Sequence, residues 1–266
     1  MPPLKAGINQ PLAVTEQGRA GAATIVFLHG GGLPGWTWEP VVAGLPGYHC
    51  LVPDLPSHGR SRDTPWESLP ATAAQVASLI RERATGGRAH LVGVSLGGQL
   101  ALQLLATEPA LIDRAVVSGT SVRRMPAAGF LSWLVRASLP WSRGEWMVRA
   151  NLRSLGIPTE HLGRYRQTLD ETDPVALGRV VGDSLRFRPR PIASGANLLV
   201  AAGRKEPGTI TRSARDLAST VPGVTLRMAP AGGHAWFLQA PDLFARMVRA
   251  WVSREPLPAE LLPMPA

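Results

Sequence analysis

Short apolar runs alternate with longer amphipathic stretches along most of the chain, and this alternation restricts the fold more than any other feature. The runs that predict strands are rich in aliphatic residues and span residues 12–15, 24–28, 50–52, 90–94, 115–117, 197–202 and 224–228. The stretches that predict helices carry apolar residues at helical spacing and span residues 71–82, 96–106, 211–219 and 241–252. Because strands that are joined through helices lie parallel in one sheet, the pattern predicts an α/β fold with a doubly wound, mainly parallel sheet.

One segment departs from this alternation. Between Thr120 and Pro191 no strand-like run is followed by a turn and a helix, and the pattern is helical with prolines at intervals. We therefore expect a helical insertion over residues 121–191 within a core domain of residues 1–120 and 192–255, followed by a mobile Pro-rich tail at 256–266. The aromatic residues of the insertion fit two roles, a small core of its own or the lining of a pocket: Phe130, Trp133, Trp141, Trp146 and Tyr165.

The composition indicates a globular protein of a reducing compartment. The chain has 266 residues, of which 45% are hydrophobic, enough to build a sizeable core. The single cysteine, Cys50, excludes an intramolecular disulfide, and its apolar neighbours indicate a thiol packed in the core. The N-terminus lacks the apolar segment of a secretion signal, and no apolar run approaches about 20 residues. We therefore expect a cytoplasmic protein with no membrane partner.

The chain carries a net charge of +9, almost entirely through arginine, and most of the excess lies near the insertion. Residues 121–192 contain 12 Arg and 6 Asp or Glu, which accounts for +6. The arginines form no dense basic run, and no zinc-ligand or RNA-binding motif accompanies them, so we expect no nucleic-acid partner. Two interpretations stay open: an arginine-rich solvated surface, or a basic rim that attracts anionic substrates.

The segment Gly93-Val94-Ser95-Leu96-Gly97 places a serine between two glycines where a predicted strand runs into a predicted helix. Side chains beside such a tight turn would clash, so glycines are favoured there. The turn lifts the serine hydroxyl to the carboxyl end of the sheet, beside the positive end of the following helix. In a Gly-rich chain this pattern is weak by itself, and it indicates a nucleophile only if other segments complete the site.

Two further segments supply what a nucleophilic serine needs. His29-Gly30-Gly31-Gly32 follows an apolar strand, and its glycines allow backbone N–H groups to approach a developing oxyanion. We expect Gly31 and Gly32 to be the donors there, together with Leu96, the residue after the serine. His234 follows two glycines beyond the last predicted strand, where it can take the serine proton.

Together these segments resemble the α/β-hydrolase family, and the resemblance covers nearly the whole chain. The glycine loop at 29–32 is similar to the family's oxyanion loop, residues 54–61 to its Asp-x-x-x-x-Gly-x-Ser segment, and residues 93–98 to its nucleophile elbow. Residues 203–206 fall where the acid loop belongs, and His234 with the following Ala240-Pro241 matches the histidine region. The order nucleophile, acid, histidine also matches. The resemblance implies that the insertion is the family's helical cap, placed between strands six and seven in the family's count.

The acid is where the chain departs from the commonest pattern of the family. Aspartate usually follows strand seven, whereas here the third residue after Gly203 is Glu206. Glutamate can orient a histidine as aspartate does, although its extra methylene must fit the loop. The neighbouring Arg204 and Lys205 leave open the alternative that Glu206 is a surface ion-pair residue. Other carboxylates lie in the insertion or in a helix, away from the expected position: Asp183 and Asp216.

Other residues near these motifs have simpler roles. His29 precedes its glycines and is expected to shape the loop, while His58 is expected to make local hydrogen bonds in a tight turn. Among the six histidines, His234 alone has the position of a base. Three tryptophans flank the motifs and fit either an apolar pocket wall or the core: Trp36, Trp38 and Trp236.

The resemblance implies a serine hydrolase that cleaves a carboxylic ester through an acyl-enzyme, with Ser95 as nucleophile, His234 as base and Glu206 as acid. Neither a cofactor nor a metal is implied, because no His, Cys or Asp cluster has ligand spacing. The expected partner is a small-molecule acyl substrate, with a homodimer as an option. Two alternatives remain open. One is another activity on the same fold, a C–C hydrolase, a lyase or a cofactor-free haloperoxidase, and the other is a non-catalytic ligand-binding protein.

Overall fold

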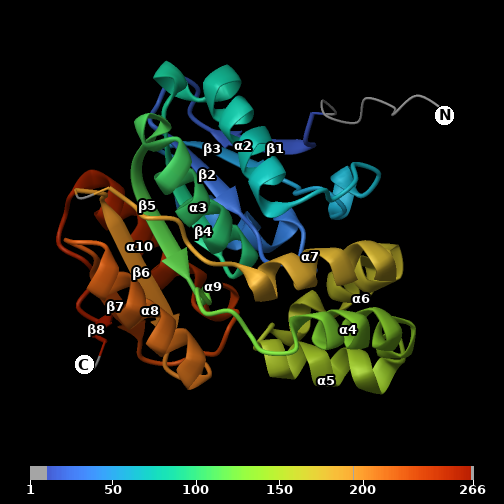
Figure 1. Ribbon diagram of the computed structural model, residues 1–266. Coiled ribbons are helices and arrows are strands. Elements are labelled where there is room, and N and C mark those ends of the chain that lie inside the picture. Colours follow the sequence, from blue (N-terminus) through green and yellow to red (C-terminus); the bar gives the residue numbers. More distant parts are fainter. Residues whose placement is uncertain (1–10, 194, 265–266) are drawn as a thin grey trace.

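The computed structural model describes residues 11–193 and 195–264, which fold around an eight-stranded sheet (Figure 1). Its strands are β1 (Val14–Gly18), β2 (Thr24–Leu28), β3 (His49–Pro53), β4 (Ala89–Val94), β5 (Ile112–Ser118), β6 (Leu198–Gly203), β7 (Thr225–Ala229) and β8 (Leu262–Pro263). They lie in the order β1-β3-β2-β4-β5-β6-β7-β8, and only the edge strands β1 and β8 are antiparallel to their neighbours. The predicted mainly parallel sheet is confirmed.

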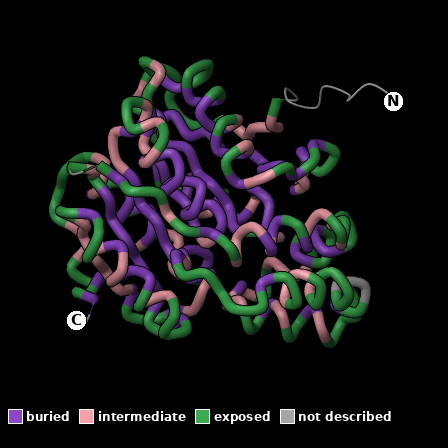
Figure 2. Tube along the Cα trace, viewed as in Figure 1, coloured by how far each residue is buried: buried purple, intermediate pink, exposed green. Residues whose placement is uncertain are grey.

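The central strands β2, β3, β4 and β6 are buried on both faces because nearly all of their residues are apolar. In β2, Val26 and Leu28 join one core cluster, while Ile25 and Phe27 join a second cluster on the opposite face. The first cluster is covered by α2 (Leu69–Arg83), α3 (Leu96–Thr107) and α8 (Gly208–Thr220), the second by α1 (Glu39–Ala43), α9 (Trp236–Gln239) and α10 (Pro241–Ser253). Figure 2 shows the sheet as the most deeply buried part of the chain. The sheet is therefore doubly wound, as the apolar runs predict.

The predicted helical segment forms four helices between β5 and β6: α4 (Ala128–Ser142), α5 (Glu145–Leu155), α6 (Leu162–Glu171) and α7 (Pro174–Arg186). Figure 1 shows them as a group beside the sheet, and a hydrogen bond of 2.9 Å from Ala235 N to Leu155 O joins them to the loop after β7. By its resemblance to the family, this group was expected after the sixth strand in the family's count. Within residues 11–193 and 195–264 it follows the fifth strand, β5, because no strand precedes β1 there. None of the helices in these residues is long and apolar enough to cross a membrane.

Of the five aromatic residues of these helices, one lies in the core and four are exposed, and one of the exposed rings, Trp133, lines a groove between α4 and α7. Tyr165 is buried, and it packs in the second core cluster. The other four are exposed: Phe130, Trp133, Trp141 and Trp146. Since α4 and α5 present these rings to solvent, the aromatic content of the insertion marks a surface instead of an internal core.

The Pro-rich tail also differs from the expectation of a mobile segment. Strand β8 pairs antiparallel with β7 through Met228 and Leu262, and the flanking Leu261 and Met264 are buried. Prolines disfavour interior strands, but an edge strand needs hydrogen bonds on one side only and tolerates them. Residues 265 and 266 of the tail lie outside the described residues.

Three side chains near the sequence motifs lie in the core: Cys50, for which this was predicted, and Trp38 and Trp236, for which a pocket wall was the alternative. Cys50 is buried, and burial raises the pKa of its thiol to about 12, as expected for a packed residue. Trp38 and Trp236 are also buried, so neither forms an exposed pocket wall. Trp36 is only half-buried, and its indole N–H donates to Thr168 Oγ1 of α6 at 3.1 Å.

Candidate active site

Ser95 stands at the junction of β4 and α3 in a conformation that side chains rarely adopt. Its φ is 52° and its ψ is −114°. The glycines around it are required by close backbone contacts. A Cβ on Gly93 would lie 2.3 Å from the Gly97 carbonyl oxygen, and a Cβ on Gly97 would lie 2.0 Å from that of Leu28. The predicted tight turn is therefore present, and it directs Ser95 to the carboxyl end of the sheet.

The Ser95 hydroxyl is not used to cap the helix that it begins. Its side chain makes no capping hydrogen bond with α3, and within residues 11–193 and 195–264 its Oγ has no hydrogen-bond partner. The residue is half-buried, and its backbone N–H donates to Ser118 O at 2.9 Å. The hydroxyl lies near the N-terminus of a twelve-residue helix, whose unpaired N–H groups favour negative charge.

Glu206 and His234 form the polar pair at the next strand ends. His234 Nδ1 lies 2.7 Å from Glu206 Oε1, and Glu206 Oε2 accepts from the Gly203 N–H at 2.9 Å. The glutamate side chain is 0% exposed, whereas that of the histidine is 32% exposed. Because the carboxylate can only accept, Nδ1 of the imidazole carries a proton, and in the neutral ring Nε2 is free to act as a base.

The alternative of a surface ion pair for Glu206 is wrong. Arg204 and Lys205 are exposed, while the carboxylate of Glu206 is buried and engaged by His234 and a backbone N–H. The loop is fixed to the segment before His234 by two backbone hydrogen bonds, Arg204 N to Ala229 O at 3.1 Å and Lys205 N to Gly232 O at 3.0 Å. The extra methylene of glutamate is thus accommodated by a loop that turns the carboxylate inward.

Gly119 connects the serine turn with the histidine–carboxylate pair. It directly follows Ser118, the residue that binds Ser95 N, and it adopts a φ of +59°. A Cβ at this position would lie 2.8 Å from Glu206 Oε1 and 3.0 Å from His234 Cε1. Sequence reasoning overlooked Gly119, although a glycine at a strand end could have indicated this close approach.

In the described part of the chain no hydrogen bond joins Ser95 Oγ to His234. Catalytic hydrogen bonds are often long before substrate binds, so the missing bond does not argue against the pairing of these residues.

The glycine loop offers fewer free donors than expected. The Gly32 N–H donates to His58 Nε2 at 2.9 Å, so the expectation that Gly32 serves an oxyanion is wrong for this arrangement. Gly31 is exposed, and a Cβ on it would lie 3.9 Å from Leu96 Cδ2 and 3.6 Å from Val180 Cγ1. Leu96 is the first residue of α3, where a backbone N–H has no partner within the helix. Gly31 and Leu96 are left as the candidate donors.

Two buried histidines hold the glycine loop in place. His29 Nε2 accepts from the Leu55 N–H at 2.8 Å and its Nδ1 donates to Gly30 O, while His58 Nδ1 donates to Pro56 O at 2.8 Å. The two rings lie 4.9 Å apart between centroids. Burial lowers the pKa of His29 to about 3, with a smaller effect from His58, and burial also lowers the pKa of His58. Both rings therefore stay neutral. His29 shapes the loop as predicted, whereas His58 makes the predicted bond within its turn and also reaches Gly32.

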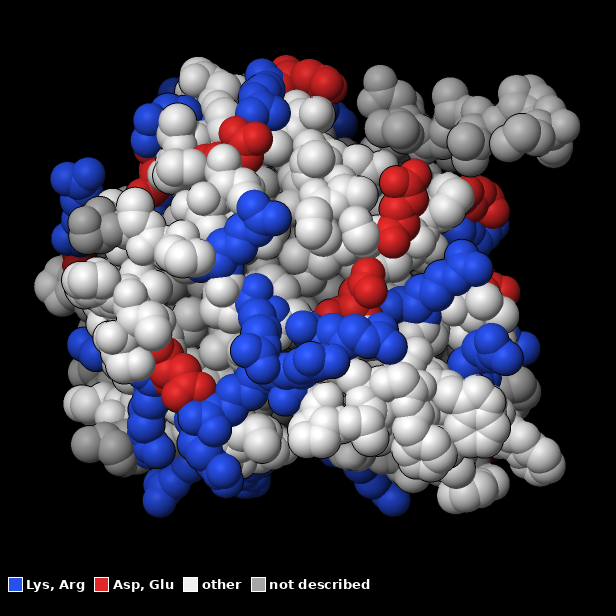
Figure 3. Space-filling view, in the orientation of Figure 1, with Lys and Arg blue, Asp and Glu red and all other residues white. Residues whose placement is uncertain are grey.

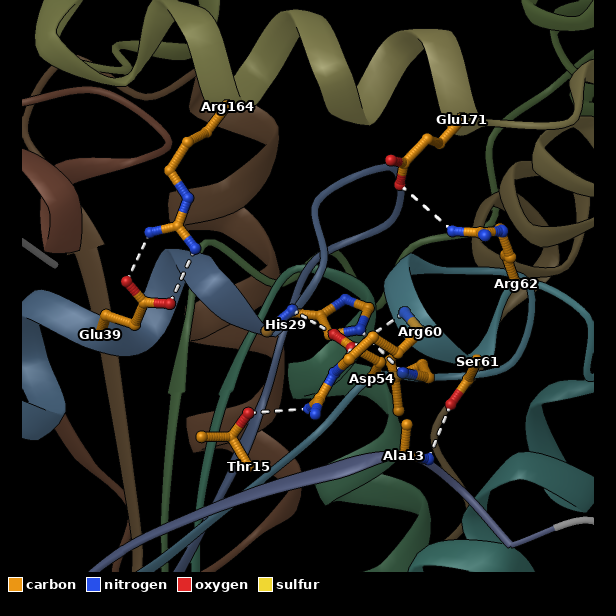
Figure 4. Close-up of polar contacts among 12 residues, drawn as sticks. Ala13, Thr15, His29, Glu39, Asp54, Arg60, Ser61, Arg62, Arg164 and Glu171 are labelled. Atoms are coloured by element: carbon orange, nitrogen blue, oxygen red, sulfur yellow. Dashed lines mark hydrogen bonds and ion pairs between the residues drawn. The ribbon is translucent and has the colours of Figure 1, made fainter.

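Asp54 organises the segment that carries His58. Its Oδ1 accepts from the Gly35 N–H at 2.7 Å, and its Oδ2 accepts from the backbone N–H and side-chain Nε of Arg60 at 3.1 and 3.2 Å (Figure 4). At the end of the same segment, Ser61 Oγ accepts from Ala13 N at 2.9 Å. These bonds join the segment to Gly35, just beyond the glycine loop, and to Ala13, just before β1. Within residues 11–193 and 195–264, no group of three or more His, Cys, Asp or Glu side chains could hold a metal ion.

The doubly wound sheet, the serine turn and the adjoining histidine–carboxylate pair define an enzyme of the α/β-hydrolase class. The family model described as the alpha/beta hydrolase family matches residues 25–247, and the chain belongs to this family. An AB hydrolase superfamily protein of Gibberella zeae is 30% identical over 247 residues, which cover 90% of this chain and 83% of that protein. An esterase of Mycobacterium tuberculosis is 38% identical over 153 residues, 53% of this chain and 51% of the esterase. The enol-lactonase of Burkholderia xenovorans LB400 has the same fold, with a TM-score of 0.78 at 19% identity, covering 91% of this chain and 96% of that one.

Proposed function

We propose that the chain is a serine esterase that cleaves carboxylic esters through an acyl-enzyme. The observation that carries the proposal is the 2.7 Å contact between His234 Nδ1 and the fully buried carboxylate of Glu206. Both side chains lie against Gly119, the residue that follows the Ser118 carbonyl bound by Ser95 N. The esterase relative supports the choice of substrate class. Burial of a carboxylate is costly unless the group is paired, so a buried carboxylate that orients a partly exposed histidine favours a catalytic protein over a non-catalytic binding protein.

The proposed reaction has two halves that use the same groups. In the first, Ser95 Oγ attacks the ester carbonyl carbon while His234 Nε2 takes its proton, and Glu206 stabilises the imidazolium. The N–H groups of Gly31 and Leu96 donate to the oxyanion. The imidazolium then protonates the leaving alcohol. In the second half, His234 activates a water molecule that hydrolyses the acyl-enzyme and releases the acid.

We also propose that helices α4 to α7 act as a cap over this site. A Cβ on Gly31 would lie 3.6 Å from Val180 Cγ1, and a Cβ on Gly32 would lie 3.5 Å from Leu177 Cδ1. Both apolar side chains belong to α7, so this helix borders the glycine loop. An acyl chain bound at Ser95 would contact α7, which supports a role for the insertion in selecting the acyl group.

Labelling with a fluorophosphonate, followed by mass mapping, tests the proposal independently of the natural substrate. We expect modification of the Ser95 peptide, together with hydrolysis of short p-nitrophenyl esters. Ser95→Ala should abolish the labelling and lower kcat by at least about a thousandfold. The control is Ser78→Ala, which changes an exposed serine of α2 and should leave both readouts unchanged.

Three outcomes would contradict the esterase. They are label on another serine, equal ester hydrolysis by the parent and Ser95→Ala chains, or turnover of a β-diketone or of halide with peroxide in the absence of ester turnover. The last outcome would favour a different reaction on the same fold.

A further inference from the structure

The outer side of the insertion is both basic and apolar. A groove of about 380 Å³ between α4 and α7 is lined by three arginines and two exposed apolar side chains, and it leads past Gly129 into a second hollow with two more arginines. We call this region the α4–α7 surface. Its members are Arg124, Met125, Phe130, Trp133, Leu134, Arg136, Trp141, Val175, Arg179, Arg186 and Arg188. Figure 3 shows arginines in a band across the molecule, next to an uncharged area over α4.

The apolar members of α4 form one continuous stripe. Phe130, Trp133, Leu134 and Trp141 are 61%, 52%, 45% and 80% exposed, and their spacing places them within about 100° of the helix circumference. The rings of Phe130 and Trp133 stack with centroids 5.9 Å apart. Trp146, the second residue of α5, is 71% exposed. Soluble proteins seldom expose so many large aromatic side chains together unless the surface binds a partner.

The arginines of this surface are free to bind an external anion. Within the described residues, none of the five forms an ion pair with a carboxylate, whereas Arg62, Arg123 and Arg164 on other surfaces do. Glu67 and Asp183 also line the groove, and Asp183 accepts a hydrogen bond from Trp66 Nε1 at 2.9 Å. Five guanidinium groups against two carboxylates leave the surface positively charged.

We propose that the α4–α7 surface docks the enzyme on an anionic lipid membrane. Arginines would bind headgroup phosphates, and the stripe of Trp133, Phe130 and Trp141 would enter the interfacial region, where tryptophan is favoured. A second copy of the chain is a poor occupant, because a symmetric interface would set the arginines of the two surfaces against each other. Helices α4 and α5 lie at one end of the molecule (Figure 1), and their aromatic side chains are exposed, so a lipid surface can accommodate them without a matching pocket.

If the enzyme docks in this orientation, only helix α7 separates the membrane from the candidate active site. Arg179 and Arg186 lie on the groove side of α7, while Leu177 and Val180 of the same helix border the glycine loop. The docking itself does not require the proposed esterase activity, so the two can fail separately.

Sedimentation of the full chain with vesicles tests the proposal. We expect binding to vesicles of phosphatidylcholine and phosphatidylglycerol in equal parts, weakening at high salt, and little binding to phosphatidylcholine alone. The triple variant Arg136→Gln, Arg179→Gln, Arg186→Gln should lower the partition coefficient roughly 100-fold. Trp133→Ser with Trp141→Ser should lower it at least about tenfold, since two interfacial anchors are removed.

A second triple variant is the matched control. Arg19→Gln, Arg212→Gln, Arg249→Gln changes the net charge equally at exposed sites outside the surface, and we expect less than about a threefold change. Circular dichroism and turnover of a soluble ester check that both triple variants fold.

Four outcomes would overturn the proposal. They are no binding to anionic vesicles at low salt, equal loss in both triple variants, binding to a small acidic protein without vesicle binding, or a solution dimer that dissociates in the tryptophan variant. The third outcome would point to a protein partner and the fourth to a second copy of the chain.

Discussion

Ser95 is held in a conformation that costs on the order of 1–3 kcal/mol for a residue with a side chain. It cannot relax, because the backbones of Gly93 and Gly97 are in contact and its own N–H is bound to Ser118 O. Among the described residues the Ser95 hydroxyl, at the start of α3, has no hydrogen-bond partner. The strained backbone thus fixes the position of Ser95 Oγ at the strand ends where the His234–Glu206 pair also lies.

The buried carboxylate of Glu206 should be essential for turnover. Glu206→Gln keeps the shape but replaces a charged acceptor with an amide, which loses the stabilisation of the imidazolium and can bind the wrong tautomer. We expect kcat for a p-nitrophenyl ester to fall by about a thousandfold or more. Glu206→Asp serves as the control and should retain more activity, because the charge remains and only the reach changes. If the glutamine variant hydrolyses the ester at a near-normal rate, the acid lies elsewhere.

The neutral histidine pair predicts a loss of stability in acid. The unfolded chain binds protons at His29 and His58 below an ordinary pKa of about 6.5, but the folded chain does not, because burial lowers both values, that of His29 to about 3. The free energy of unfolding should therefore fall as the pH decreases from about 6.5 toward about 3. Urea denaturation near neutral pH and at about pH 5 measures this fall.

The double variant His29→Gln, His58→Gln identifies the groups responsible. It should be less stable than the parent near neutral pH, since buried hydrogen bonds are lost, but its stability should depend less on pH. His90, whose pKa burial also lowers, accounts for part of the remaining slope. An unchanged pH dependence in the double variant would mean that the folded chain protonates the two histidines at the same pH as the unfolded chain.

Sequence patterns located the strained serine and the histidine, but they could not assign the N–H of Gly32. That group lies beside Gly31 in a run of three glycines, and nothing local distinguishes the two. The distinction depends on His58, which is 26 residues further along the chain and reaches Gly32 only in the folded sheet. Glu206 was predicted as the acid from its spacing from Gly203, and this role stays a prediction, while its burial and its contact with His234 are known only from the structure.

At the level of elements, predictability follows from burial. Residues 24–28 were predicted with the bounds of β2 because a strand covered on both faces must be apolar throughout. The helical character of the insertion was predicted from its sequence pattern. The exposure of the aromatic residues of α4 was not, because apolar side chains usually face the core and those of α4 face solvent. The edge strand β8 was missed because its prolines are signals of a loop.

Strand β8 should contribute measurably to stability although it contains only two residues. Leu261, beside this strand, is 4% exposed, whereas its neighbour Leu262 is 41% exposed. We expect Leu261→Ala to lower the free energy of unfolding by about 2–4 kcal/mol, and Leu262→Ala to change it by about 0.5 kcal/mol or less. Urea denaturation of both variants measures the difference. Equal and small effects would mean that the tail detaches in solution.

At the scale of the whole molecule, helix α6 is held to the core by charged groups at both of its ends. Arg164 pairs with Glu39 of α1, and its guanidinium lies 4.8 Å from the centre of the Trp36 ring, while Glu171 pairs with Arg62 at 3.5 Å (Figure 4). These four charged side chains are about half exposed, so each ion pair is worth only about 0.5 kcal/mol. Such contacts fix the position of a helix without preventing local opening.

Removal of both ion pairs should therefore loosen α6 without unfolding the molecule. We expect Glu39→Gln with Glu171→Gln to raise amide hydrogen exchange in α6 by about fivefold, because about 1 kcal/mol is removed from the closed state, and to lower the midpoint of thermal unfolding by no more than about 4 °C. High salt should have a similar effect on the parent chain. The control, Glu108→Gln with Glu260→Gln, removes two exposed ion pairs away from α6 and should leave its exchange unchanged. If exchange in α6 is the same in all three chains, apolar packing of Tyr165 and Leu169 in the core cluster, and not charge, holds the helix in place.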